Sequence, residues 1–244
     1  MAGLVVPPFV SVRGVGETIE FPSNGGATDG YLATPAQTPA PGVVVVQEWW
    51  GLVPQIQRTC DRLAEAGFVA LAPDLFHGDI AEHTEMDLAA ELMNTLPPDR
   101  AARDMGAAVD ALLANPDVDG DSVGVVGFCM GGMLALVLAA QQGDRVGAVV
   151  PFYGAPLGDG APDWSGLSAP VLGHYAEEDA FFPVDAVLAL GEELADLGKD
   201  VTFVMYPGLG HAFGNEENAL GTYDADATAQ AWARTLDFLH ARLG

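Results

Sequence analysis

Six short runs of apolar, mostly β-branched residues recur along the chain, and they constrain its fold more than any other feature. The runs cover residues 43–46, 68–72, 123–126, 146–150, 171–175 and 201–206. A strand with one solvated face alternates apolar and polar residues, whereas a continuous apolar run is typical of a strand buried on both faces of a parallel sheet. The pattern therefore predicts a parallel sheet with helices on both sides.

Segments between these runs have the spacing of amphipathic helices. Apolar residues recur at i, i+4 and i+7 in three of them. These are Ile56, Cys60 and Leu63; Met105, Val109 and Leu112; and Trp232, Leu236 and Leu239. Gly67 and Gly198 follow two helical segments, and Pro97 and Pro98 open another, as helix ends prefer. Each helix is expected to lay its apolar face on the sheet.

Two shorter β-type runs, residues 17–21 and 30–33, flank the polar, glycine-rich residues 23–29 near the start of the chain. This arrangement predicts an antiparallel hairpin. No repeat or linker divides the 244 residues, of which 50% are hydrophobic, enough to bury a sizeable core. We therefore expect one α/β domain over residues 1–244, with a mostly parallel, doubly wound sheet behind an N-terminal antiparallel hairpin.

Residues 122–143 carry no charge and are long enough to resemble a membrane span. Four glycines interrupt this segment, at Gly124, Gly127, Gly131 and Gly132. They favour a short strand, a tight turn and a buried helix, which together have the hydropathy of a span. No membrane partner is therefore expected.

The chain has 34 acidic and 9 basic residues, so its surface is expected to be strongly negative. No basic patch is available for nucleic acid or an anionic membrane. Met1–Arg13 lacks the basic segment of a secretory leader, and two cysteines are too few for a disulfide framework. A cytoplasmic enzyme is the simplest interpretation.

The chemistry is expected to reside in Gly127-Phe-Cys129-Met-Gly131, directly after the apolar run 123–126. A strand, a strained turn with small residues two positions either side of a nucleophile, and a helix form a nucleophile elbow. The helix dipole favours a thiolate at this position. Cys129 is therefore the candidate nucleophile, with a buried structural cysteine as the alternative. Cys60, on an apolar helix face, is expected in the core.

A thiol nucleophile needs a base, and the base needs an acceptor that orients it. His211 lies in a glycine-rich loop after the run 201–206, where the carboxyl ends of parallel strands gather catalytic groups. His174 lies inside an apolar run and His240 near the end of the last helix, so both fit this role worse. His211 is the candidate base.

His77 and His83 flank a polar loop that also contains Asp79 and Glu82. Such a group raises the possibility of a metal site. The spacing matches no standard helical ligand pair. We therefore expect no metal and no cofactor.

The orienting acid is expected between nucleophile and histidine in the chain, in the loop after the run 171–175. Asp179 meets this condition. Glu177, Glu178 and Asp185 are near enough that spacing alone leaves them as alternatives.

The chain resembles the dienelactone hydrolase family of α/β-hydrolases, whose name-giving activity is that of a carboxymethylenebutenolidase. The resemblance covers nearly the whole chain. The motifs that carry it are Gln47-Glu48-Trp49-Trp50-Gly51, Ala72-Pro73-Asp74-Leu75, Gly127-Phe128-Cys129-Met130-Gly131-Gly132, Phe152-Tyr153-Gly154, the Asp179 loop and Gly210-His211-Ala212-Phe213. It favours Asp179 over its acidic neighbours.

The resemblance also implies further roles. Glu48 is implied to contact the resting thiol and to help convert it to thiolate when substrate arrives. The backbone N–H groups of Trp49 and Met130 are implied to form the oxyanion hole. Family members bind a substrate carboxylate with two arginines, and this chain has Gly78 and Asn215 at those places.

Loss of two guanidinium groups favours a neutral or less anionic substrate in a more apolar pocket. Arg58, Arg100 and Arg103 are expected on the solvated surface, with entry of one of them into the pocket from a neighbouring helix as the alternative. Phe76, Tyr153 and Asn215 are expected among the substrate-binding residues, and the aromatics considered for the pocket also include Trp49, Trp50, Phe181, Phe182 and Phe213.

The sequence thus predicts a hydrolase that cleaves a small-molecule ester or lactone through an acyl-enzyme, as a monomer or small homo-oligomer. Thioesterase or acyltransferase chemistry on the same triad is one alternative. A non-catalytic binding protein with the same fold is another. A dinucleotide site fits poorly, because Gly124, Gly127 and Gly131 miss the required glycine spacing.

Overall fold

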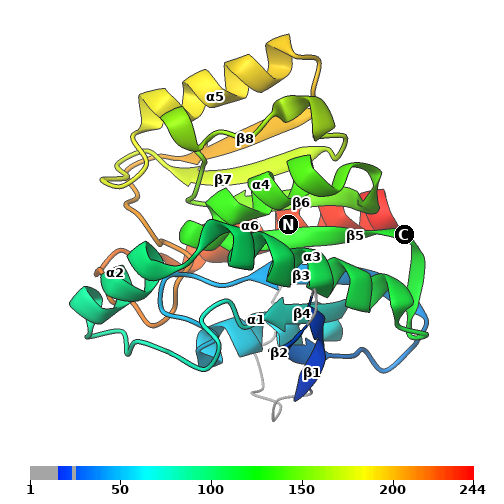
Figure 1. The fold of residues 1–244 in the computed structure, drawn as a ribbon. Coiled ribbons are helices and arrows are strands. Elements are labelled where there is room, and N and C mark those ends of the chain that lie inside the picture. The colour runs from blue at the N-terminus through cyan, green and yellow to red at the C-terminus, as the bar shows by residue number, and fades with distance from the viewer. Residues whose placement is uncertain (1–15, 24–25) are drawn as a thin grey trace, which may run out of the picture.

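A sheet of eight strands runs through the computed structural model, which describes residues 16–23 and 26–244 (Figure 1). Met1–Arg13, where no secretory leader is expected, lies outside the described residues. The strands are Glu17–Ser23 (β1), Gly26–Ala33 (β2), Ala40–Val46 (β3), Val69–Pro73 (β4), Val118–Phe128 (β5), Val146–Phe152 (β6), Val171–Ala176 (β7) and Val201–Tyr206 (β8).

Helices lie on both faces of the sheet (Figure 1). The α-helices are Pro54–Glu65 (α1), Met86–Thr95 (α2), Pro98–Ala114 (α3), Met130–Gln142 (α4), Val184–Asp196 (α5) and Ala225–Leu243 (α6). Single 3-10 turns occur at Gly143–Arg145 (η1), Gly158–Gly160 (η2) and Trp164–Gly166 (η3).

The strands lie in the order β1-β2-β4-β3-β5-β6-β7-β8. Neighbours from β4 to β8 run parallel, whereas β2 is antiparallel to both β1 and β4. The opening hairpin pairs Glu17 with Leu32 and continues to Ser23 opposite Gly26. The prediction of a mostly parallel sheet behind an antiparallel hairpin is confirmed. Residues 24–25, in the predicted turn, lie outside the described residues.

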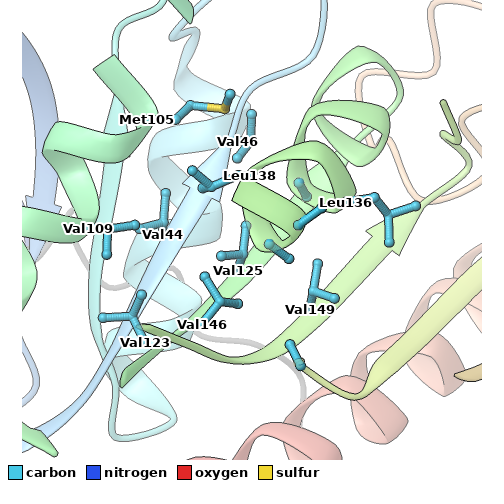
Figure 2. Close-up of a cluster of buried hydrophobic side chains, with 14 of the residues drawn as sticks. Val44, Val46, Met105, Val109, Val123, Val125, Leu136, Leu138, Val146 and Val149 are labelled. Atoms are coloured by element: carbon cyan, nitrogen blue, oxygen red, sulfur yellow. The ribbon is translucent and has the colours of Figure 1, made fainter. Parts of the chain in front are cut away.

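Alternate residues of the central strands face opposite helical layers. Val44 and Val46 of β3 pack in a cluster with α3, α4 and α5, and Val43 and Val45 pack in a second cluster with α1 and α6. Figure 2 shows the first cluster, in which β5 and β6 contribute further valines. Two-sided burial explains why these strands read as continuous apolar runs.

The uncharged residues 122–143 divide as their glycines predict. β5 ends at Phe128, Cys129 forms the turn, and α4 begins at Met130. Within the described part of the chain, no helix is long and apolar enough to cross a bilayer.

α1, α3 and α6 occupy the three segments with predicted helical spacing. Cys60 is fully buried on α1, as predicted. Sequence reasoning placed a helical segment before Gly198, which is α5, but assigned no helix to α2. In α5 the signal was present, because Val187, Leu190 and Leu194 form a buried stripe. In α2 only Ala89 is buried, so the periodic signal is weak.

His174 is buried in β7, as expected. Its Nδ1 lies 3.0 Å from the Tyr206 hydroxyl and its Nε2 lies 3.1 Å from the Thr235 hydroxyl. Burial, helped by the charge of Arg234, lowers the pKa of His174 from 6.5 to about 3. Below pH 6.5 the His174 imidazole therefore takes up a proton in the unfolded chain, whereas in the folded chain it stays neutral.

This histidine should make wild-type stability fall by up to about 1.4 kcal/mol per pH unit as the pH decreases below the unfolded pKa. We expect His174→Gln to be less stable than wild type at pH 8, and the difference to narrow toward pH 5. Urea unfolding of both proteins across this range measures it. A difference that stays constant would contradict the lowered pKa.

Candidate active site

Five loops at the carboxyl edge of the parallel strands bring the predicted site residues together. Glu48 follows β3, Cys129 follows β5 and Tyr153 follows β6. Asp179 follows β7 and His211 follows β8. β3, β5, β6, β7 and β8 are successive neighbours in the sheet, so their ends meet along one edge.

Cys129 occupies a strained turn between β5 and α4. Its backbone angles are φ 53° and ψ −119°, a region that residues with a side chain rarely adopt. A Cβ on Gly127 would lie 2.0 Å from the carbonyl oxygen of Gly131, and one on Gly154 would lie 1.9 Å from that of Cys129. The backbone approaches too closely for side chains here, which accounts for the small residues around the cysteine.

His211 bridges the thiol and a carboxylate. Its Nε2 lies 3.1 Å from Cys129 Sγ, and its Nδ1 lies 2.8 Å from Asp179 Oδ2. The other carboxylate oxygen, Oδ1, accepts hydrogen bonds from the backbone N–H groups of Phe181 and Phe182 at 2.8 and 2.9 Å. This arrangement can pass the thiol proton to the imidazole while the carboxylate holds the ring in place.

The three competing carboxylates lie elsewhere. Glu177 accepts a hydrogen bond from the Gly208 backbone N–H at 2.9 Å, and the side chains of Glu178 and Asp185 are exposed. Asp179 is the one of these four acids that bonds to His211.

The remaining histidines are occupied away from the thiol. His77 Nε2 lies 2.8 Å from Asp104 Oδ2, the His83 ring packs on Trp50, and the His240 ring packs edge-on against Phe68. In residues 16–23 and 26–244, no three His, Cys, Asp or Glu side chains gather as metal ligands would.

Glu48 is a buried carboxylate, only 1% exposed, and neutral side chains hold it. The Tyr153 hydroxyl donates to Oε1 at 3.0 Å, and Asn215 Nδ2 donates to Oε2 at 2.7 Å. Burial raises the pKa of Glu48, and His211 and these hydrogen bonds oppose that rise. The resemblance implies contact of Glu48 with the resting thiol, whereas here the thiol bonds to His211.

Burial raises the pKa of the Cys129 thiol, and the nearby charge of Glu48 raises it further. A backbone hydrogen bond from Met130 lowers this pKa, but by less than burial and Glu48 raise it. Burial and Glu48 thus favour the protonated thiol, whereas the helix dipole alone favours a thiolate. Its ionisation requires a base, and His211 is in contact with it.

Met130 and Trp49 are the residues whose backbone N–H groups are expected to stabilise an oxyanion. Met130 is the first residue of α4, so its N–H has no acceptor within the helix. A Cβ on Gly131 would lie 2.3 Å from the carbonyl oxygen of Val46, so the first turn of α4 abuts the segment leading to Trp49. Trp49 lines the same cavity as Cys129. The role of these two N–H groups as an oxyanion hole stays a prediction.

A small cavity opens beside Cys129 and His211. Glu48 and Asn215 lie in its wall, together with Trp49, Trp50, Asn218, Ala219, Leu220 and Thr222. Among the described residues, no arginine or lysine lines it. Phe76 lies instead in the hydrophobic core beneath the sheet edge, so its expected substrate contact is not part of this cavity.

The places of the two family arginines carry no cation. Gly78 has a φ of 98° and open space where a Cβ would lie. Arg58 and Arg103 are exposed, as expected. The same expectation is wrong for Arg100, which is half-buried because its Nη2 donates to the Leu75 carbonyl at 3.3 Å.

Two contacts of this site were not anticipated. The Thr222 hydroxyl donates to the His211 carbonyl and so ties the histidine loop to a segment further along the chain. The rings of Phe181 and Phe182 flank the His211 imidazole at centroid distances of 4.7 and 5.7 Å. An aspartate carboxylate that accepts the N–H groups two and three residues further along the chain is a known turn pattern. The sequence Asp179-Ala-Phe-Phe could therefore have predicted the turn that brings these two rings to His211. No sequence pattern predicted the contact of Thr222 with His211.

A mostly parallel sheet with helices on both faces, and a cysteine on a sharp strand-to-helix turn, define an α/β-hydrolase fold. The sequence profile of the dienelactone hydrolase family matches residues 28–243. The chain belongs to the dienelactone hydrolase family and is a hydrolase of the esterase type.

Relatives align over nearly the full chain. The protein named usf from Aquifex pyrophilus is 36% identical over 230 residues, 92% of this chain and 97% of that protein. A candidate carboxymethylenebutenolidase of Aquifex aeolicus is 34% identical over 235 residues, 94% of this chain and 100% of that protein. The crystal structure of P91, a dienelactone hydrolase-like promiscuous phosphotriesterase from metagenomic libraries, matches with a TM-score of 0.80 and 27% identity over 95% of this chain and 100% of P91.

Proposed function

We propose that this protein hydrolyses neutral esters or lactones through a covalent acyl-enzyme on Cys129. The observation that carries the proposal is the hydrogen-bonded series from Cys129 Sγ through His211 to Asp179. Cys129 and His211 line a cavity in whose described wall there is no arginine or lysine. A thiol, a base and an orienting carboxylate in this order are the requirements of nucleophilic acyl transfer.

In the first half-reaction, Cys129 Sγ attacks the substrate carbonyl carbon and its proton moves to His211 Nε2. The carbonyl oxygen becomes an oxyanion, which the backbone N–H groups of Met130 and Trp49 stabilise, at about 3 kcal/mol for each donor. The tetrahedral intermediate collapses, the C–O bond to the leaving group breaks, and His211 returns the proton to the departing alkoxide. Asp179 keeps the imidazole oriented throughout.

In the second half-reaction, water attacks the thioester carbonyl and gives a proton to His211. The C–S bond then breaks, and the thiolate recovers the proton to form the resting thiol. Glu48 and burial together favour that thiol, so the sulfur is protected from oxidation between turnovers. A lactone opens in the same way and releases a hydroxy acid.

A neutral phosphotriester is a second candidate substrate. Such a triester carries no charge, which suits a cavity without a described cation. The similarity to P91 favours this candidate. It would use the same attack by Cys129, at phosphorus in place of carbon.

The test combines a substrate panel with thiol labelling. We expect neutral aryl esters and lactones to give the free acid, with a competing alcohol diverting only a minor share. Iodoacetamide should label Cys129 before Cys60, because Cys60 is fully buried and burial raises the pKa of its thiol. Peptide mapping identifies the labelled cysteine. Predominant ester formation from the alcohol would establish an acyltransferase, and first labelling at Cys60 would refute the nucleophile.

A further inference from the structure

The side-chain amide of Asn215 is engaged at both of its ends. Its Nδ2 donates to Glu48 Oε2 at 2.7 Å, and its Oδ1 accepts the backbone N–H of Glu217 at 3.0 Å. Reversing the amide would set its NH₂ group against the Glu217 N–H and its oxygen against the carboxylate. The Glu217 backbone therefore determines which end of Asn215 meets Glu48.

The two glutamates after Asn215 are tied to helix α1. Arg58 bonds to the carboxylate of Glu217, and Arg62 bonds to that of Glu216 at 3.1 Å. Arg58 and Arg62 are one helical turn apart, so they present both guanidinium groups on the same side of α1. Two of the chain's 9 basic residues are thus committed to consecutive residues of one loop beside the active site.

Arg62 is itself anchored. Its guanidinium lies over the Trp232 ring of α6, 4.8 Å from the ring centroid. Trp232 is buried, so the stacking partner is fixed by the core. The ion pair with Glu216 therefore starts from a constrained side chain, which reduces the entropy lost when it forms.

From these contacts we infer that Arg58 and Arg62 are positioning residues, which hold the loop over residues 215–218 so that Asn215 presents its amide to Glu48. The effect passes from Arg58 through Glu217 and Asn215 to the buried carboxylate. Neither arginine lines the cavity or touches a reacting atom. The inference rests on the proposed hydrolase function for its kinetic readout.

Exposed ion pairs add little to folding stability and are screened by salt. Breaking the Arg58–Glu217 pair is therefore expected to change the geometry of the site and not the unfolding midpoint. Freed from α1, the loop would release the Asn215 amide from Glu48, and the carboxylate beside Cys129 would lose one of its donors. Misplacement of a group near the reacting atoms by about 1 Å can cost about 100-fold in rate.

The test compares Arg58→Glu with a charge-swapped double variant, Arg58→Glu with Glu217→Arg. Glu217→Gln removes the same pair more gently. Arg145→Glu is the matched control, because it breaks the exposed pair between Arg145 of η1 and Asp110 of α3 and changes the net charge equally. The ester kcat/KM is measured for each at ionic strengths of about 0.01 M and about 1 M, where the Debye length is about 30 Å and about 3 Å.

We expect Arg58→Glu to lower kcat/KM roughly tenfold at low salt, mainly through kcat, and the swap to restore it to within about threefold. High salt should lower the wild-type value and leave Arg58→Glu nearly unchanged. Arg145→Glu should behave as wild type. All unfolding midpoints should agree closely. Equal kinetics for Arg58→Glu and Arg145→Glu, or no rescue by the swap, would overturn the inference.

The alkylation rate of Cys129 by iodoacetamide gives a readout that needs no ester substrate. Because the charge of Glu48 raises the pKa of the thiol, a displaced carboxylate should change this rate in Arg58→Glu and not in Arg145→Glu. A wild-type protein that hydrolyses no ester would refute the proposed function, and the labelling comparison would still decide the positioning role.

Discussion

Replacing Cys129 with alanine is expected to lower kcat/KM for ester hydrolysis by about 10⁴-fold or more, because removing the nucleophile of a triad costs about as much as removing the whole unit. The residual rate would come from the oxyanion donors and from substrate binding. Steady-state kinetics with a neutral aryl ester measure the loss. Mass spectrometry should show an acyl adduct on the wild type during turnover and none on the variant.

The fold should tolerate this substitution. Cys129 is only partly buried and its Sγ bonds to the His211 side chain, so alanine removes little packing. The strained backbone angles do not depend on the sulfur. His211→Ala is the companion variant and should cost a comparable factor. Retained activity in Cys129→Ala with unchanged unfolding would exclude the proposed nucleophile.

Much of this fold was predictable because the signals for it are local. A strand between two helical layers must be apolar at every position, as Val43 to Val46 are, and such a run is visible without knowledge of its neighbours. The start of β5 was not visible in this way. It begins at Val118 and includes the polar Asp119, whose strand pairing with Pro41 of β3 arises only in the assembled sheet.

The same difference between local and long-range signals applies to the candidate site. The elbow around Cys129 and the loop around His211 are contiguous motifs, so sequence reasoning could place both residues at the carboxyl edge. The hydrogen bonds of Glu48 come from Tyr153 and Asn215, which are 105 and 167 positions away in the chain. No local pattern encodes contacts at that separation. The ion pairs of α1 with the loop over residues 215–218 were unpredictable for the same reason.

The Asn215 side chain also leads to an expectation about substrate charge. With no described cation in the cavity wall and a carboxylate at Glu48, an anionic substrate has nothing to offset the loss of its water shell. Charged hydrogen bonds contribute roughly 1.5 to 3 kcal/mol each, so the absence of two should cost such a substrate about 100-fold or more in kcat/KM. The overall charge of −25 adds further repulsion.

The measurement is kcat/KM for two aryl esters that differ only in one carboxylate. We expect the wild type to prefer the neutral ester by about 100-fold, and Asn215→Arg to reduce that preference by placing a guanidinium in the cavity wall. Gln141→Arg is the control. It adds the same charge at an exposed position near the far end of α4, about 17 Å along the helix from Met130.

The comparison separates a local effect from a change in the overall field. If Gln141→Arg shifts the preference as far as Asn215→Arg does, long-range charge and not the cavity wall governs selection. Asn215→Arg also removes the acceptor for the Glu217 backbone N–H, so its rate on the neutral ester should fall. The quantity to compare between variants is therefore the ratio of kcat/KM for the two esters. A wild type that prefers the anionic ester would refute the proposal of a neutral substrate.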